Sequence, residues 1–561
     1  MKKINLLLIV TALIRLNSIV AQDSEGGKPY SFLNQLNDDL IATVTTPAFD
    51  FAPLIALSEQ RVKQGTYQLT DKLFDVSYDL LNSGTWTALS NGERLWKLKI
   101  VSPGAKKISV YFQNFYLPDG AKLFVYNGNR TQEIGAFTSK NNEEATSNEG
   151  IFSTDHLIGD TQILEYYEPE NVKGQGHFSI FRISHQFKSV LIDESEPCQK
   201  DIMCPDGANW QNQKKGVVRI FVVIGSSAGW CTGSLVNNTA QDCKKYILTA
   251  MHCAIDESNG VETTAYSQWK FYFDYEKTGC ATGTALTNKV KTGCAKRASA
   301  ADGGATGSDF LLVEISSATF PTGVTPYYLG WTRSTSVTAG GVGIHHPASD
   351  CKKISTFITT PTSTSWGGQV AATHWRFVWQ AGHGSTEPGS SGSPVFNTAG
   401  LIFGTLTGGG SCCVANGCQS PGSSPTLPDA YGKIAYHWTS NGSANSQQLK
   451  PWLDPNNSGV TTLAGSYTCT PAGIATNSLD NQVSIYPNPT EGKFQVQSLK
   501  FKITSLEVYN ILGEIVYRLP IIQSTNYPIN IDISGQPKGI YFIRLHSENT
   551  DLSTTKKIII Q

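Results

Sequence analysis

The amino-acid sequence predicts an all-β protein that is divided into several domains. Its 561 residues exceed what a single hydrophobic core usually serves. Only 16% of the residues are charged, and 52 residues are glycine. Serine and threonine are also abundant. This composition favours strands and turns over long helices. Short apolar–polar alternations recur between turn sequences, and the strand–helix–strand alternation of a parallel sheet is missing.

The first 21 residues are typical of a secretory signal peptide. Lys2 and Lys3 are basic, residues 6–14 are mostly apolar, and a cleavage site precedes Gln22. This apolar run is too short for a membrane anchor, and no later stretch approaches ~20 apolar residues. We therefore expect an exported chain without a transmembrane helix. The net charge of −1 gives no electrostatic argument for a nucleic acid partner.

Residues 22–190 are predicted to form a β-rich domain that resembles a small β-sandwich. Residues 95–100 and 108–112 alternate between apolar and polar side chains, and turn sequences separate such segments. The domain contains no cysteine and no catalytic constellation. We interpret its scattered histidines as ordinary surface or core residues: His156, His177 and His185.

Residues 191–465 are predicted to form a second all-β domain, which contains 11 of the 12 cysteines. In an exported chain this clustering argues for disulfides, and no paired C-x-x-C motif supports the alternative of a metal site. The pairing cannot be deduced from the sequence alone. The strand candidates are residues 217–224, 246–249, 269–275, 310–315 and 402–406.

Beyond this domain, residues 466–482 are polar and are predicted to be a linker. Residues 483–561 are predicted to form a third unit, another small all-β sandwich.

Three motifs of the second domain supply a histidine, an aspartate and a serine in that order. His252 follows an apolar strand candidate, Asp309 precedes another, and Ser391 lies in the turn Gly389-Ser390-Ser391-Gly392. A serine hydroxyl becomes a nucleophile when a base takes its proton and an acid fixes the tautomer of that base. The order His, Asp, Ser is that of the two-barrel serine proteases, so a pair of barrels fits better than an α/β hydrolase.

Each of these residues has a competing explanation. Ser391 could belong to a Gly/Ser-rich turn without chemistry. His345 and His346 are alternative bases, but no aspartate motif lies near them. Asp302 is the nearest alternative acid, but it lies in a Gly/Ala loop.

The glycine before the catalytic turn has a predicted role of its own. Gly389 can adopt backbone angles that aim its N–H inward. The N–H groups of Gly389 and Ser391 would then form an oxyanion hole, which contributes about 3 kcal/mol per donor in the transition state.

Substrate selection can also be argued from the sequence. Trypsin-like enzymes carry the charge of the specificity pocket six residues before the nucleophile, and this position holds the neutral Ser385. Asp429 could enter the pocket from a later segment, where a buried carboxylate would select a cationic side chain. Taken alone, Asp429 is more readily explained as a turn residue.

These motifs and the sequence around them resemble the bacterial lysyl endopeptidase family of chymotrypsin-like serine proteases. The resemblance covers about residues 193–465, and the shared stretches are 231–239 (CTGSLVNNT), 343–347 (GIHHP) and 386–394 (TEPGSSGSP). It implies a chymotrypsin-like double β-barrel that hydrolyses peptide bonds on the carboxyl side of lysine. It implies neither a cofactor nor a metal.

Carried over by position, the resemblance implies the triad His252, Asp309 and Ser391, and it makes Asp429 the lysine-selecting aspartate. The family also stacks a tryptophan on a histidine beside the triad. Trp366 matches this tryptophan, whereas the histidine position reads Thr407, followed by Gly408 in the same pocket wall. The departure puts in question the stack and the pH behaviour that accompanies it.

The family's three disulfides map onto pairs of cysteines in this chain. They are Cys198 with Cys413, Cys204 with Cys280, and Cys231 with Cys253, the last of which would hold the loop of His252. The resemblance assigns no partner to the six other cysteines: Cys243, Cys294, Cys351, Cys412, Cys418 and Cys469.

Residues 483–561 resemble the type A C-terminal sorting signal of the type IX secretion system. The YPNP sequence at 486–489, the strand around 508–510 and the Lys556-Lys557 pair before a short apolar end carry this resemblance. It implies that the type IX machinery is a partner, that the chain crosses the outer membrane, and that the domain is then removed. Residues 22–190 resemble the propeptide of the same protease class.

Activation is expected to differ from that of the trypsin group. There, an aspartate just before the nucleophile pairs with a newly freed N-terminal amine, and here this position holds the neutral Ser390. We expect instead that the pro-region assists folding or covers the cleft, and that cleavage releases it. Lys188 is a candidate for self-cleavage, and the cut should fall before Lys200.

Two alternatives remain at this point. An inactive protease fold could serve as an adhesin or binding module, although an intact triad argues against it. The enzyme could also accept both lysine and arginine, because Asp429 explains a positive charge but does not distinguish a compact ammonium from a planar guanidinium. The substrates are therefore expected to be proteins or peptides with lysine at the cleaved bond.

Overall fold

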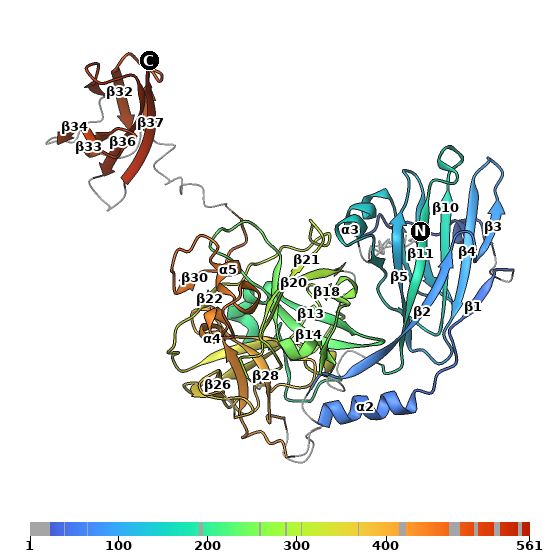
Figure 1. Cartoon of the computed structure of the whole chain (residues 1–561). Coiled ribbons are helices and arrows are strands. Elements are labelled where there is room, and N and C mark those ends of the chain that lie inside the picture. The colour runs from blue at the N-terminus through green and yellow to red at the C-terminus, as the bar shows by residue number, and fades with distance from the viewer. Residues whose placement is uncertain are drawn as a thin grey trace, which may run out of the picture. The chain divides into compact units, whose positions relative to one another are not determined.

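The computed structural model describes residues 23–36, 38, 40–63, 66–189, 194–256, 260–285, 289–304, 306–368, 370–413, 422–469, 483–498, 503–520, 528–547 and 553–561. The predicted signal peptide, most of the predicted linker and Cys418 lie outside these residues. The chain separates into two compact units, Met1–Cys469 and Thr470–Gln561, which are described separately (Figure 1). Strands dominate both units, so the all-β prediction is confirmed.

The N-terminal region, which ends near residue 190, begins with a sheet in the order β1-β4-β10-β6-β7, with β3 beside β4. Alternate residues of its strands enter a shared core that includes Trp96, Leu98, Leu123 and Leu164. The strands are β1 (Thr43–Thr45), β3 (Thr85–Ala88), β4 (Arg94–Val101), β6 (Lys122–Asn127), β7 (Glu133–Phe137) and β10 (Thr161–Glu168). The helices of this region are α1 (Tyr30–Leu33), α2 (Ala52–Lys63) and α3 (Asn142–Ser147).

A second sheet crosses the boundary that the sequence predicted between pro-region and second domain. Its strands from the N-terminal region are β2 (Leu69–Asp79), β5 (Lys107–Tyr116), β8 (Phe152–Ser153), β9 (Leu157–Ile158) and β11 (His177–Gln186). Strand β2 pairs with β14 (Ser227–Leu235), so that Lys72 lies opposite Ser227 and Leu69 opposite Gly229 (Figure 1). Gly229 permits this approach, because a Cβ there would lie 2.4 Å from the carbonyl oxygen of Gln68.

The first barrel of the second domain continues this sheet. Its strands are β13 (Val217–Ile224), β14, β15 (Tyr246–Thr249), β18 (Lys270–Tyr272), β19 (Val290–Thr292), β20 (Cys294–Ser299) and β21 (Leu311–Ile315). Every residue of β13 is buried, which explains why its side chains are apolar apart from Arg219, whose guanidinium packs on the Trp230 ring. The barrel core includes residues of the N-terminal region, among them Leu54, Tyr67 and Leu69.

The second barrel is built around the order β12-β24-β23-β27-β28-β29-β26-β25. Its strands are β12 (Lys200–Asp201), β22 (Trp331–Thr332), β23 (Gly341–His345), β24 (Lys353–Phe357), β25 (Thr362–Thr364), β26 (His374–Phe377), β27 (Pro394–Asn397), β28 (Ile402–Gly409), β29 (Asp429–Lys433) and β30 (Thr462–Leu463). The helices α4 (Ile434–Thr439) and α5 (Lys450–Leu453) follow β29. A disulfide between Cys243 and Cys469 extends this unit four residues beyond the predicted boundary at 465.

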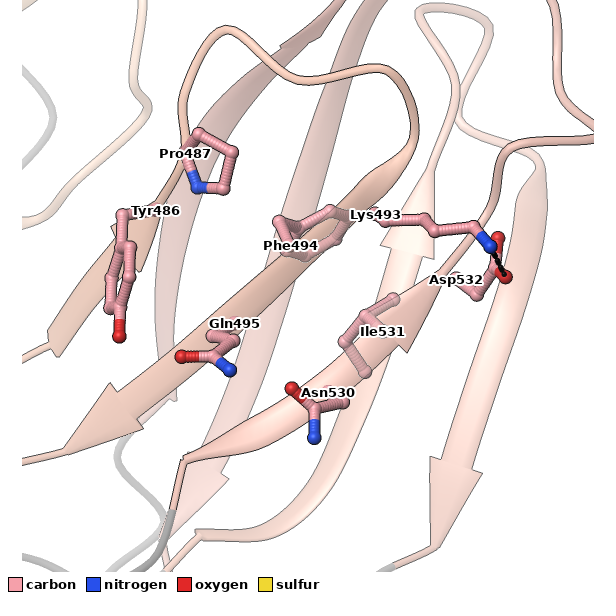
Figure 2. A pocket seen from close by; sticks show the side chains of 8 residues that line it. All are labelled: Tyr486, Pro487, Lys493, Phe494, Gln495, Asn530, Ile531 and Asp532. Carbon is pink, nitrogen blue, oxygen red and sulfur yellow. Dashed lines mark ion pairs between the residues drawn. The ribbon is translucent and has the colours of Figure 1, made fainter.

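The C-terminal unit packs one sheet, β31-β32-β35, against another in the order β34-β33-β36-β37. Its strands are β31 (Val483–Tyr486), β32 (Lys493–Ser498), β33 (Ile503–Tyr509), β34 (Ile515–Pro520), β35 (Ile529–Asp532), β36 (Gly539–Ser547) and β37 (Ser553–Ile560). A groove of about 600 Å³ lies over the first sheet and is lined by residues that include Tyr486, Phe494 and Ile531. The Lys493–Asp532 ion pair lies at one end of this group of side chains (Figure 2). Among the residues that the structure describes, no helix is long and apolar enough to cross a membrane.

Candidate active site

His252 and Asp309 form a buried pair in the first barrel. The short 3-10 helix Met251–Ala254 carries His252 directly after β15, and Asp309 lies two residues before β21, which pairs with β15. The imidazole Nδ1 lies 2.7 Å from Asp309 Oδ2, and the backbone N–H of His252 donates to Oδ1 at 2.9 Å. The carboxylate therefore fixes both the ring and the backbone of the histidine.

The backbone of Asp309 is itself unusual, because its φ of +58° lies in the left-handed region. Aspartate tolerates this conformation better than most residues, although it still costs free energy. Asp309 is fully buried, and its carbonyl oxygen accepts the N–H of Met251 at 3.4 Å. The strained conformation thus places the carboxylate beneath the histidine helix.

Ser391 is held against the same end of strand β15. Its carbonyl oxygen accepts the N–H of Thr232 at 2.8 Å. The next residue, Gly392, has φ +78°, and a Cβ on it would lie 2.1 Å from Thr249 Oγ1 and 2.6 Å from Ala250 N. Only glycine lets this turn approach the strand that leads to His252.

The turn also leaves two N–H groups available. Gly389 has φ +102°, and its carbonyl oxygen accepts the hydroxyl of Thr232 at 2.8 Å. Among the described residues, the N–H groups of Gly389 and Ser391 donate to no protein acceptor. This is the arrangement that an oxyanion hole requires, since its donors must wait for the substrate.

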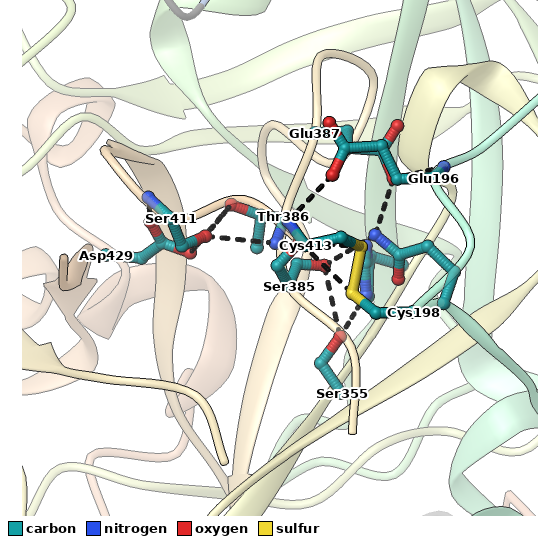
Figure 3. Close-up of a disulfide and its surroundings, with 11 residues drawn as sticks. Glu196, Cys198, Ser355, Ser385, Thr386, Glu387, Ser411, Cys413 and Asp429 are labelled. Atoms are coloured by element: carbon teal, nitrogen blue, oxygen red, sulfur yellow. Dashed lines mark hydrogen bonds between the residues drawn. A yellow bond between two sulfur atoms is a disulfide. The ribbon is translucent and has the colours of Figure 1, made fainter. Parts of the chain in front are cut away.

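Asp429 lies fully buried at the start of β29 in the second barrel. Its Oδ2 accepts hydrogen bonds from Trp379 Nε1 at 2.6 Å and from the hydroxyls of Thr386 and Ser411, each at 2.7 Å. Within the described residues, its Oδ1 accepts only the N–H of Ser411, at 3.2 Å (Figure 3). Burial raises the pKa of this carboxyl, and these hydrogen bonds partly offset the effect.

Two glycines at the end of β28 lie close to this carboxylate and to Trp366. A Cβ on Gly409 would lie 2.0 Å from Asp429 Oδ1, and one on Gly408 would lie 3.0 Å from the Trp366 ring. The glycine pair after Thr407 is therefore required, because side chains at these positions would press on Asp429 and on the Trp366 ring. No lysine, arginine or histidine of the described chain forms an ion pair with Asp429.

The ring beside Trp366 is a histidine that the sequence analysis did not find. His374, on β26, lies 6.1 Å from the Trp366 ring with a tilt of 37°, and its Nε2 lies 3.0 Å from Thr407 Oγ1. Burial lowers the pKa of His374 to about 4, so the ring is neutral at neutral pH. Only the cross-strand pairing of β26 with β29 brings it here, and no local sequence signal reports that pairing.

The alternative candidates are engaged elsewhere. His345 lies between Ser390 Oγ at 2.8 Å and Ser355 Oγ at 2.9 Å, and burial lowers its pKa to about 3. His346 Nδ1 lies 3.0 Å from the carbonyl oxygen of Asp350. Asp302 accepts backbone N–H groups within its own loop.

The structure contains disulfides at each pair that the resemblance implied: Cys198–Cys413, Cys204–Cys280 and Cys231–Cys253. The last joins β14 to the residue after His252. Of the unassigned cysteines, Cys243 pairs with Cys469 and Cys412 is disulfide-bonded, whereas Cys294 and Cys351 are buried thiols.

Comparison with protein families gives three matches along the chain. Residues 75–187 match the lysyl endopeptidase N-terminal domain, and residues 192–431 match the lysyl endopeptidase C-terminal domain. Residues 484–561 match the secretion system C-terminal sorting domain, which indicates export by type IX secretion to the cell surface or the extracellular space.

Individual relatives are more distant. The chain is 28% identical over 278 residues to the lysyl endopeptidase of Pseudomonas aeruginosa, a match that covers 46% of this chain and 57% of that protein. The chain therefore spans less than two thirds of this relative. Among solved structures, protease Anisep from Arthrobacter nicotinovorans is 17% identical with a TM-score of 0.28, covering 42% of this chain and 93% of that one. A Glu endopeptidase in complex with MPD is 15% identical with a TM-score of 0.27, covering 44% and 93%.

The match to the N-terminal domain precedes the match to the C-terminal domain, and the second match contains His252, Asp309 and Ser391. The chain belongs to the lysyl endopeptidase family and carries a C-terminal sorting domain of a secretion system.

Proposed function

We propose that this protein is a secreted serine endopeptidase that cuts peptide bonds on the carboxyl side of lysine. The main support for this proposal is that two segments meet at the end of β15. His252, paired with Asp309, follows this strand, and Gly392 lets the turn of Ser391 lie against the same strand end.

Each residue then has a chemical role. His252 takes the proton of Ser391 as the hydroxyl attacks the scissile carbonyl, and Asp309 holds the imidazole with Nδ1 protonated. The N–H groups of Gly389 and Ser391 stabilise the oxyanion of the tetrahedral intermediate. His252 next donates its proton to the leaving amine, and water hydrolyses the acyl-enzyme by the same steps in reverse.

The lysine preference follows from the surroundings of Asp429. Its partners are neutral donors, so the buried carboxylate lacks a counter-charge that a cationic side chain would supply. Thr386, Ser411 and Trp379 surround Oδ2, which leaves Oδ1 toward the space beside Gly409. A compact ammonium needs less room there than a planar guanidinium, so we favour lysine over arginine.

The pro-region is proposed to assist folding before it is released. Its strand β2 extends the barrel sheet, and Tyr67 and Leu69 share the barrel core. Buried polar pairs join the same surfaces: Lys270 Nζ donates to the carbonyl oxygen of Thr154 at 2.7 Å, and the Tyr272 hydroxyl to Asp155 at 2.8 Å. Lys188 stays the candidate cleavage site. A Ser391→Ala precursor, expressed alone, that acquired the native N-terminus would exclude self-cleavage there.

The test of the function is a digest of a mixed protein substrate, with mass spectrometry of the new C-termini. Processed enzyme should leave almost only lysine ends, Ser391→Ala should leave none, and Asp429→Asn should lose the preference. Equal numbers of lysine and arginine ends would retain the peptidase and reject the pocket assignment. No cleavage, together with no fluorophosphonate label on Ser391, would favour the inactive binding module.

A further inference from the structure

We propose that Glu387, with Glu196 beside it, binds the α-ammonium group that processing creates at the new N-terminus, and that this ion pair positions the nucleophile turn. The inference rests on the proposed function, because it assumes that the chain is cut ahead of the barrels. In the trypsin group the activating carboxylate occupies the position of Ser390, which is neutral here. The carboxylate proposed here belongs to Glu387, three residues upstream.

Glu387 is a buried carboxylate without a counter-ion. Only 8% of the residue is exposed, and its Oε1 accepts hydrogen bonds from Gln199 Nε2 at 2.6 Å and from the Glu196 N–H at 3.0 Å. Its Oε2 is buried and accepts no hydrogen bond in the described part of the chain. There, too, no lysine, arginine or histidine pairs with it. Burial accordingly raises the pKa of Glu387 to about 7.

A second carboxylate faces this group. Oxygens of Glu196 and Glu387 lie within 4.8 Å of each other, and Glu196 Oε2 accepts the N–H of Cys413 at 2.7 Å (Figure 3). Two like charges at this separation repel each other, and a cation between them would remove the cost for both. The neighbouring Asp350 differs, because Lys353 already lies 3.3 Å from it.

The geometry selects an ammonium group over a metal ion. Calcium requires about six to eight oxygen ligands, whereas the groups around these carboxylates are N–H donors from Glu196, Cys413 and Gln199. A primary ammonium has three donors and can satisfy two carboxylates without further ligands.

The position in the chain identifies the source of that ammonium. The two family matches end at residue 187 and resume at 192, so a cut between the domains leaves a terminus a few residues from Glu196. The disulfide Cys198–Cys413 fixes the following residues at the site. A tethered amine is present at a high effective concentration, which a free cation would not match.

Glu387 acts on the catalytic turn through its backbone. Its N–H donates to Ser390 Oγ at 3.2 Å, and its carbonyl oxygen accepts the N–H of Ser390 at 2.9 Å. The Ser390 hydroxyl also contacts His345 Nδ1 at 2.8 Å. Glu387 is thus a positioning residue for the turn whose N–H groups, at Gly389 and Ser391, form the oxyanion hole.

The decisive experiment compares Glu387→Gln before and after cleavage, in a Ser391→Ala background cut after Lys188 by an added lysine-specific protease. In the uncut precursor the substitution should leave Tm unchanged or raise it, because it removes an uncompensated buried charge. In the cut protein it should lower Tm, because it removes one partner of an ion pair. Glu194→Gln removes a nearby exposed charge and should change neither value. A Glu387→Gln effect of the same sign and size in both forms would overturn the proposal.

Active enzyme supplies the second readout. Acetylation of the new α-amine should lower kcat/KM at least about ten-fold in wild type and have little further effect in Glu387→Gln. The alkaline fall of kcat/KM, as the amine deprotonates, should be present in wild type and absent in Glu387→Gln. The charged or titratable groups that face the site, Glu196, Asp350, Lys353 and His345, are unchanged by the substitution.

Two further outcomes would reject either the ammonium site or the proposed function. If acetylation changes nothing while calcium or EDTA shifts Tm in a Glu387-dependent way, the site holds a metal and the proposal is wrong. If cut wild-type protein neither cleaves peptides nor takes a fluorophosphonate label, the proposed function fails. The Tm comparison still decides the ammonium site in that case, because it needs no catalysis by this chain.

Discussion

Asp309 and Asp429 are both fully buried carboxylates, but their partners differ in kind. Asp309 is hydrogen-bonded to the imidazole of His252, a ring that would gain charge in the proposed reaction. Asp429 is surrounded by an indole, two hydroxyls and a backbone N–H, all of which stay neutral. The partner of Asp309 that can become a cation is therefore a side chain of the protein. Asp429 lacks such a partner among the described residues, as expected of a carboxylate that binds a cationic ligand.

The largest expected effect breaks the first of these pairs. Asp309→Asn should lower kcat by about 10⁴-fold, because an amide does not hold His252 in the tautomer that accepts the serine proton. Steady-state kinetics on a lysyl ester would measure it. Asp302→Asn is the matched control, since Asp302 only caps its own loop, and it should stay within about two-fold of wild type. An equal loss in both variants would reject the assignment of Asp309.

Asp429→Asn should have a smaller effect, which should appear in the cleavage of lysine substrates and not in the reactivity of Ser391. We expect kcat/KM for lysine substrates to fall by about 10²- to 10³-fold, because the ammonium loses a buried ionic partner. The rate of fluorophosphonate labelling should not change, since the triad is intact. Loss of labelling would mean that the residue supports the catalytic fold rather than the pocket.

The same variant tests the state of this carboxyl without substrate. Burial raises the pKa of Asp429 in the folded protein, so its contribution to stability is present at acid pH and lost as pH rises through that raised pKa. Asp429→Asn should therefore be at least as stable as wild type at pH 8 and gain least at pH 4. Thermal melts at pH 8 and pH 4 would measure the difference in Tm between Asp429→Asn and wild type. A larger gain in Tm at pH 4 than at pH 8 would contradict the prediction.

A steric change should give an intermediate loss of lysine cleavage. Gly409→Ala places a Cβ 2.0 Å from Asp429 Oδ1, so the carboxylate must move away from the space that the lysine would enter. We expect kcat/KM for lysine substrates to fall at least about ten-fold at constant labelling rate. Gly535→Ala, whose added Cβ would meet nothing within 4 Å, should behave like wild type. Full activity of Gly409→Ala would place the substrate ammonium elsewhere.

The sequence was most informative where local pattern and chemistry coincide. The mostly apolar segments at 217–224 and 246–249 are strands β13 and β15, because each is short and buried. The glycine-flanked serine and the aspartate before a strand were recognisable because their backbone conformations restrict the residue types that fit. The small β-sandwich predicted for residues 22–190 was less complete, because β2 pairs with a strand about 150 residues away.

The residues that the sequence missed depend on pairing over long distances. His374 reaches Trp366 because β26 lies beside β29, and Glu387 meets Glu196 because a disulfide joins segments 215 residues apart. Neither contact leaves a periodic or motif signal in the chain. The match of Thr407 to a histidine position predicted the loss of a ring, whereas the fold supplies one from a neighbouring strand.

The smallest expected effect concerns that ring. Burial lowers the pKa of His374 from 6.5 to about 4 although Asp309 favours its charged form, so the unfolded chain binds more protons between these values. Its contribution to stability is thus present above about pH 6.5 and lost as pH falls toward 4. Wild type should lose more Tm between pH 7 and pH 5 than His374→Gln, whereas the exposed His177→Gln should follow wild type. Because His374 stays neutral above pH 6, the pH profile of kcat/KM should be the same in wild type and in His374→Gln. A clear displacement of that profile in His374→Gln would instead make this ring an electrostatic partner of Asp309, and the contrast with Asp429 would then rest on two histidines rather than one.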